Sequence, residues 1–207
     1  MQVPFCRSIF RTILVFALVI FFSSSALKSL PLHTQRLHYK VFVSGKDRGS
    51  LHADITRQAD ASFQIRLETR LHFPFTDVVS LIQVNYSAKG LEHASSMKHI
   101  NNDLKEKFIT QRVNGGYSLT DVDGNNSQFK QEIPFSVGRL YHDEPVGRSE
   151  IFSERLGAFV PLRALRKGEY ELVQPDGKKN VFVYRYGICT EMRTEMMACN
   201  VRFVLSE

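Results

Sequence analysis

The 207-residue sequence lacks a hydrophobic run of the length that a membrane-spanning helix needs. Its N-terminal apolar stretch covers only residues 12–22, whereas a spanning helix needs about 20 apolar residues. Arg7 and Arg11 precede this stretch, and small residues follow it up to Ala26. These are the three parts of a secretory signal peptide. We therefore expect residues 1–26 to be a signal peptide cleaved after Ala26, with an uncleaved anchor as the alternative.

Cysteine is scarce, with three residues in the whole chain, of which Cys6 lies in the expected signal peptide. The other two, Cys189 and Cys199, form no C-x-x-C motif, which argues against a catalytic redox pair. In an exported chain, two cysteines this close favour a disulfide. A turn centred on Thr194 would place them opposite each other on neighbouring strands, at a separation that a disulfide tolerates. Two buried free thiols are the alternative.

No dense block of lysine or arginine is present, although the formal net charge is +6. The positive charge is scattered along the chain, so the sequence predicts no nucleic-acid partner. It predicts contact with a membrane only through the signal segment, should that segment stay uncleaved. The rest of the chain has the length of one domain with a real core. We expect a leader over residues 27–36 and a single domain over residues 37–207.

Alternation of apolar and polar residues predicts β-strands, most clearly over residues 62–73. Period two puts the apolar side chains of this segment on one face and the charged ones on the other, which a helix would not do. If the preceding turn centres on Asp60, Ile55 faces Ile65, and the same register sets opposite charges against each other on the outer face. An earlier hairpin centred on Lys46 would pair Tyr39 with Ala53.

Further strands with short turns between them predict an antiparallel meander. One short helix is expected over residues 136–141, after Pro134. The predicted fold class is all-β with one short helix, a single antiparallel meander sheet curled into a half-barrel or open barrel. The other expected strands are residues 37–43, 51–55, 78–89, 91–99, 104–113, 117–122, 150–154, 159–165, 169–174, 181–186, 188–193 and 199–205.

Motifs of catalysis are missing. The sequence contains neither a serine nucleophile elbow nor a glycine-rich phosphate or dinucleotide motif. The best local candidate for metal binding or acid–base chemistry is the run His142, Asp143 and Glu144. Three consecutive residues in a loop do not converge on one atom unaided, so a capping or surface role is the stronger interpretation. We predict no catalytic residue, no metal site and no cofactor.

An apolar ligand is suggested by the predicted sheet, because a long apolar face with few helices to cover it must curl on itself or bind something. Alternatively, the same residues form a closed hydrophobic core without a ligand, and this is the favoured interpretation. The candidate ligand-binding residues are Phe63, Ile65, Leu67, Leu71, Phe73, Phe182 and Phe203.

Residues 133–145 (IPFSVGRLYHDEP) and 175–184 (PDGKKNVFVY) resemble segments of an uncharacterised family of exported bacterial proteins that carry a domain of unknown function. The resemblance covers most of residues 37–205. It implies an antiparallel sheet, a half-barrel distantly similar to periplasmic lipoprotein-carrier domains, and it supplies no catalytic residues.

Together these observations predict an exported, non-enzymatic protein of the periplasm or cell envelope. Its expected partner is an apolar or lipidic ligand, or another envelope protein, on a curved β-sheet. Two alternatives stay open: a hydrolase-type enzyme with a site near His142, and a structural module that interacts through exposed strand edges.

Overall fold

The computed structural model describes residues 31–196 and 199–206, so the expected signal peptide lies outside the described residues. The described chain folds into 14 strands and one 3-10 helix, η1 (Val137–Tyr141). The strands are β1 (Pro31–Val43), β2 (Lys46–Gln58), β3 (Phe63–Phe73), β4 (Thr76–Ser87), β5 (Gly90–Ile100), β6 (Asp103–Val113), β7 (Gly116–Asp121), β8 (Asn126–Phe129), β9 (Glu150–Ser153), β10 (Ala158–Arg166), β11 (Glu169–Val173), β12 (Lys179–Arg185), β13 (Ile188–Met196) and β14 (Cys199–Leu205).

All strands belong to one sheet in the order β8-β7-β6-β5-β4-β3-β2-β1-β14-β13-β12-β11-β10-β9. Every ladder between these strands is antiparallel. The first and last strands pair in the middle of the sheet, where Val41 faces Phe203. The two edges are β8 and β9, and they do not pair, so the sheet remains open. The predicted class, a single antiparallel meander curled into an open barrel, is confirmed.

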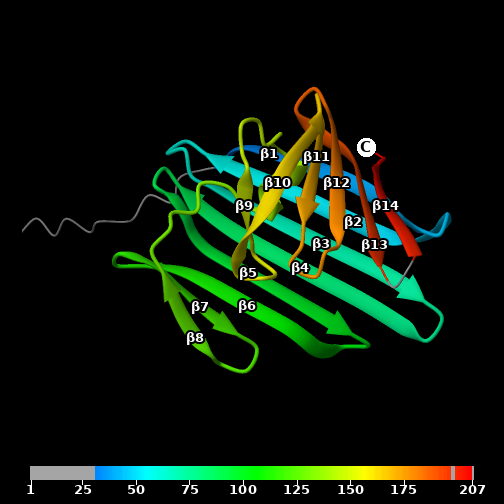
Figure 1. The fold of residues 1–207 in the computed structure, drawn as a ribbon, viewed down its shortest axis with the longest axis horizontal. Helices are drawn as coiled ribbons and strands as arrows, with labels where there is room; N and C mark the ends of the chain where they lie inside the picture. Colours follow the sequence, from blue (N-terminus) through cyan, green and yellow to red (C-terminus); the bar gives the residue numbers. More distant parts are fainter. Residues whose placement is uncertain (1–30, 197–198, 207) are drawn as a thin grey trace, which may run out of the picture.

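The sheet has two limbs that lie across each other. Figure 1 shows the long strands β1–β6 side by side, while β9–β13 (yellow to orange) cross part of their face at a steep angle. Among the described residues no helix layer separates the two limbs, since η1 is a single short turn at their junction. The curl of one sheet therefore creates both halves of the core.

Alternating burial follows the sequence pattern directly. In β3, Ile65 and Leu67 are buried, whereas the neighbouring Gln64 and Arg66 are exposed. The predicted register between β2 and β3 is confirmed, because Ile55 pairs with Ile65. A one-residue shift of either strand would turn every apolar side chain outward.

Aromatic side chains join the two limbs in the core. The Tyr39 ring of β1 meets the Tyr141 ring of η1 edge-on, with centroids 5.4 Å apart, and Tyr141 in turn meets Phe182 of β12 at 6.1 Å. Tyr39 and Phe182 are fully buried. Fully burying an aromatic or large aliphatic side chain is worth roughly 1.5–3 kcal/mol, so this contact line contributes substantially to holding the sheet curled.

Three expectations about strand limits are corrected. Residues 31–36 are not a leader but the first part of β1, where Gln35 pairs with Ile55 of β2. The turn between β1 and β2 lies at residues 44–45, so Tyr39 pairs with Leu51 rather than with Ala53. Strand β8 was not expected, because its polar sequence carries no alternating apolar pattern.

The predicted disulfide is wrong in this structure, since both cysteines are free. The turn between β13 and β14 follows Met196 instead of centring on Thr194, and Met196 pairs with Cys199. Cys189 lies seven residues earlier on β13, about 23 Å along a strand that rises 3.3 Å per residue. Burial raises the pKa of the Cys189 thiol to about 12, so this cysteine stays protonated and unreactive.

Candidate functional site at the crossover segment

The chain between β8 and β9, residues 130–149, is the crossover segment; it passes along the open side of the sheet. Its backbone is bonded to both limbs. The Leu91 amide at the start of β5 donates to the Ile133 carbonyl (3.2 Å), and the Phe152 amide of β9 donates to the Phe135 carbonyl (3.1 Å). Ser136 adds an isolated parallel bridge to Phe152. The segment therefore fills the gap that the unpaired edges leave.

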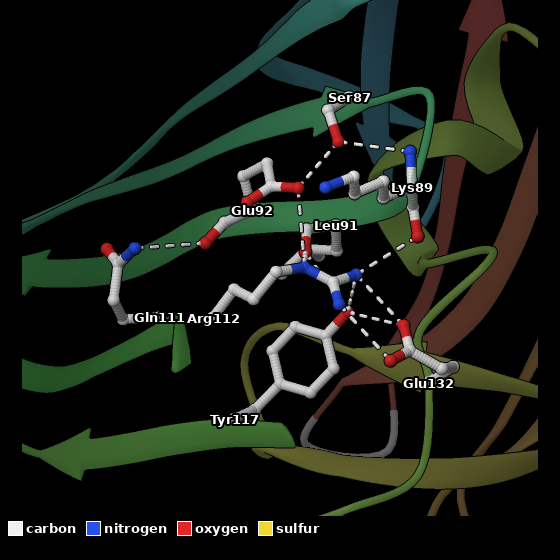
Figure 2. Close-up of polar contacts among 8 residues, drawn as sticks. All are labelled: Ser87, Lys89, Leu91, Glu92, Gln111, Arg112, Tyr117 and Glu132. Atoms are coloured by element: carbon white, nitrogen blue, oxygen red, sulfur yellow. Dashed lines mark hydrogen bonds and ion pairs between the residues drawn. The ribbon is translucent and has the colours of Figure 1, made fainter. Parts of the chain in front are cut away.

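A guanidinium clamp fixes the start of this segment, as Figure 2 shows. Arg112 of β6 donates to the Leu91 carbonyl (3.0 Å), to the Lys89 carbonyl (3.1 Å) and to the Glu132 carboxylate (2.9 Å). Its guanidinium also donates to the Tyr117 hydroxyl (2.6 Å) and lies 4.9 Å from the centre of that ring. The Arg112 hydrogen bond holds the pKa of Glu132 below its usual range. The clamp is charge-paired and binds β5, β6, β7 and the crossover segment together.

Beside the clamp lies a pocket of about 320 Å³. Its apolar walls are Phe63, Tyr86 and Pro134, and the first two rings stack with centroids 4.7 Å apart. Lys89 and Arg139 are its cationic groups and Glu132 is its acidic group. The volume falls at the lower end of the range of small-molecule sites.

The charges of the pocket do not balance. Arg139 pairs with Asp143 (3.0 Å), and Glu132 pairs with Arg112 (2.9 Å). The exposed Lys89 ammonium has no hydrogen bond or ion pair with the residues that the structure describes. Lys89 therefore leaves one uncompensated positive charge at the rim of a partly aromatic pocket.

Behind the pocket lies a buried polar cluster of Tyr86, Ser136 and Glu154. The Glu154 side chain is 1% exposed and accepts the Gly138 amide through Oε1 (2.9 Å). Its Oε2 and the hydroxyls of Tyr86 and Ser136 have no hydrogen-bond partner among the described residues. Burial raises the pKa of Glu154. The buried carboxyl is thus easier to protonate than an exposed glutamate.

The run His142, Asp143 and Glu144 does not converge. Each side chain contacts a different part of the molecule. Their partners are Gln35, 3.2 Å from His142 Nδ1; Arg57 and Arg139 on Asp143; and Tyr170, whose hydroxyl donates to Glu144 at 2.9 Å. Burial lowers the pKa of His142 to about 4, so its imidazole is neutral at physiological pH. The geometry favours the structural interpretation over a catalytic one.

The candidate apolar residues lie mostly in the core. Five of them are at most 8% exposed and belong to the continuous hydrophobic cluster, namely Ile65, Leu67, Leu71, Phe182 and Phe203. Phe63 and Phe73 are partly buried against the same cluster. Of the seven, Phe63 lines the pocket beside the clamp. The packing thus follows the closed-core alternative for most of the set.

Sequence reasoning did not find the clamp or the pocket. Their members come from five strands (β3 to β7), a turn and the crossover segment, so no short spacing relates Arg112 to Glu132 or to Lys89. The one local signal was the Lys89-Gly90 pair, which the sequence marks only as a turn. Within residues 31–196 and 199–206, no group of three or more histidine, cysteine or acidic side chains is arranged to hold a metal, and no helix is long and apolar enough to cross a membrane.

This architecture defines an open, barrel-like protein made of one antiparallel sheet. The chain belongs to the family described as a domain of unknown function, DUF6134, whose model matches residues 39–206. The resemblance noted above, to an uncharacterised family, is thereby confirmed.

A solved structure with a similar fold is the beta-barrel-like protein of domain of unknown function DUF1849 from Brucella abortus. The two share 12% sequence identity at a TM-score of 0.54, over 86% of this chain and 98% of that one. At this identity the likeness concerns the fold alone. A search of curated proteins finds no match.

Proposed function

We propose that this chain is an exported, non-enzymatic protein of the cell envelope that binds a small anionic amphiphile in the pocket beside the clamp. The observation that carries the proposal is the unpaired Lys89 ammonium at the rim of a pocket walled by Phe63 and Tyr86. A carboxylate or phosphate headgroup would pair with Lys89, and a short apolar tail would cover the stacked rings.

Export is proposed from the N-terminal segment, which has the charge, apolar length and small-residue site of a signal peptide. The intact mass of protein purified from the periplasm tests it. A mature chain that begins at Leu27 supports cleavage, whereas the full-length mass in a membrane fraction would favour the anchor.

The non-enzymatic part of the proposal is supported by the divergent partners of His142, Asp143 and Glu144. A general base and its reacting group must lie within hydrogen-bond reach of one substrate position. His142 and Asp143 instead contact β1 and two arginines, respectively.

Isothermal titration with decanoate, below its micelle concentration, tests the ligand class. We expect one site per chain and at least a roughly tenfold weaker affinity in Lys89→Glu, which replaces attraction with repulsion at the rim (about 1.4 kcal/mol per factor of ten). Decanol, which has the tail without the charge, should bind more weakly than decanoate.

The matched control is Lys40→Glu, an exposed lysine of β1 that does not line this pocket. Its affinity for decanoate should equal that of the parent protein. Equal losses in both variants would indicate a general charge effect, and no binding by the parent protein would overturn the proposal. In that case, binding of another envelope protein would become the leading alternative.

A further inference from the structure

Two histidines lie face to face on the outer surface of the sheet, away from the pocket. His38 of β1 and His52 of β2 are directly paired across the strands, and their rings stack with centroids 4.6 Å apart and planes inclined by 24°. The row continues to Glu68 of β3, which pairs with His52. These side chains line a groove of about 460 Å³.

The surroundings of the pair are close to neutral. Arg36 and Arg66 also line the groove, and Asp54 and Glu68 offset their charge. Both Glu68 oxygens are already held, Oε2 by Arg66 (2.6 Å) and Oε1 by an arginine further along β3. The Glu68 side chain is thus committed to arginines, and the two histidines and the Asp54 carboxylate are the groups of the groove that could bind a metal.

Ser206 lies against the imidazole of His38. Its backbone amide and its hydroxyl both reach the His38 carbonyl, at 2.8 Å and 2.9 Å. The hydroxyl oxygen also lies 3.1 Å from His38 Nδ1. When the hydroxyl donates to the carbonyl, it accepts the Nδ1 hydrogen, and the lone pair of the ring is left on Nε2. Fixing one ring nitrogen by a hydrogen bond to leave the other for a metal is the arrangement found around metal-binding histidines.

We propose that the His38–His52 pair binds one divalent transition metal ion through its two imidazoles, with water completing the coordination. Imidazole nitrogens suit Zn²⁺, Cu²⁺ and Ni²⁺. Two Zn–N bonds of about 2.0–2.1 Å place the two nitrogens at most about 4 Å apart. Because the lone pair of an imidazole lies in the plane of its ring, the exposed His52 ring must rotate out of its stacked position to share a metal with His38. The site has two protein ligands, fewer than the three or more that the tightest metal sites have.

Zn²⁺ titration followed by imidazole nitrogen NMR of the protein tests this site, with Cys199→Ser as the background that removes the accessible thiol. The chain has seven histidines. We expect the ring signals of His38 and His52 to shift together at one Zn²⁺ per chain, while those of the others stay in place. His52→Gln should weaken Zn²⁺ binding at least tenfold.

Ser206→Ala tests the positioning role of the serine. It should weaken Zn²⁺ binding roughly tenfold and change the tautomer signature of His38 in the metal-free protein, and Ser206→Thr should restore both. The control is His99→Gln, a histidine of β5 outside this groove, which should bind Zn²⁺ as the parent does. Binding that survives His52→Gln, or that shifts other histidines equally, would overturn the proposal. Decanoate binding plays no part in either result, so this site and the pocket are tested separately.

Discussion

The hydroxyl of Tyr39 donates a 2.7 Å hydrogen bond to the carbonyl oxygen of Cys189, a residue 150 positions later in the chain. Tyr39 lies on β1 and Cys189 on β13, with β14 between them in the sheet. Both residues are fully buried. The bond therefore crosses a strand inside the core and ties the two limbs where the sheet curls.

Tyr39→Phe keeps the ring and removes only this donor. We expect the free energy of unfolding to fall by about 1–2 kcal/mol, because the Cys189 carbonyl loses its buried partner. Urea denaturation measures the change. The control is Tyr186→Phe at a fully exposed turn, which should have no effect. Equal behaviour of the two variants would mean that the Tyr39 bond contributes nothing net.

Arg112→Gln should destabilise the protein by roughly 2–3 kcal/mol. The substitution breaks charge-assisted bonds to Glu132 and removes the donor from two backbone carbonyls. Arg70→Gln is the comparison, since this exposed arginine also contacts a carboxylate, yet surface ion pairs are worth roughly 0–1 kcal/mol. Thermal unfolding of both variants gives the difference. A larger loss in Arg70→Gln would contradict the clamp.

His142 makes the free energy of unfolding decrease as the pH falls below neutral. The unfolded chain takes up a proton near the ordinary histidine pKa of 6.5, whereas the folded protein resists protonation down to about 4. Stability is therefore complete above pH 6.5 and is lost as the pH falls toward 4, by about 3 kcal/mol. His142→Gln should remove this part of the pH dependence. Parallel curves of unfolding free energy against pH for variant and parent would disprove it.

Glu154 acts in the opposite direction. Its folded pKa is raised by burial, so its contribution is present below the usual glutamate range and is lost as the pH rises through the folded value. Glu154→Gln keeps an acceptor for the Gly138 amide without a titrating group. We expect the variant to gain stability relative to the parent as the pH increases above the usual glutamate range. The exposed Glu195→Gln should show no such trend.

Phe75 occupies the tip of the turn between β3 and β4 with its side chain 97% exposed and a φ of +66°. Left-handed backbone costs a residue with a Cβ roughly 1–2 kcal/mol, and the Asn101 amide, donating to the Phe75 carbonyl, holds it there. Phe75→Gly should raise the free energy of unfolding by about 1 kcal/mol, measured with urea. Phe75→Ala retains the Cβ and should give no such gain.

The strands were predictable because their signals are local. Alternation in residues 63–73 determines which face is buried, and the charges of Asp54 and Arg66 agree with the register that the structure has. The register of β13 and β14 was misplaced, because no strong turn residue marks the connection after Met196. The misplaced register set Cys189 opposite Cys199 and so predicted a disulfide, which the actual register does not allow.

The candidate site was less accessible to sequence reasoning than the fold. Arg112 and Lys89 lie in different hairpins, and they come together only because β5 and β6 pair and the crossover segment passes over them. The stacked His38 and His52 were equally hidden, since their pairing depends on the turn at residues 44–45, which the sequence pattern placed too late. Contacts of this kind depend on strand register. A sequence pattern that misplaces one turn shifts the register of the whole hairpin and so changes which residues are paired.

The pairing of β1 with β14 has a consequence for the order of folding. Among the described strands, the other ladders join neighbours in the chain, which are local and quick to form, whereas this one closes a loop of nearly the entire domain. A chain made from its N-terminus must keep the free edge of β1 unoccupied until the last strand emerges. During that interval β1 is exposed to pairing with other chains, so the protein should depend on chaperones more than its local hairpins suggest.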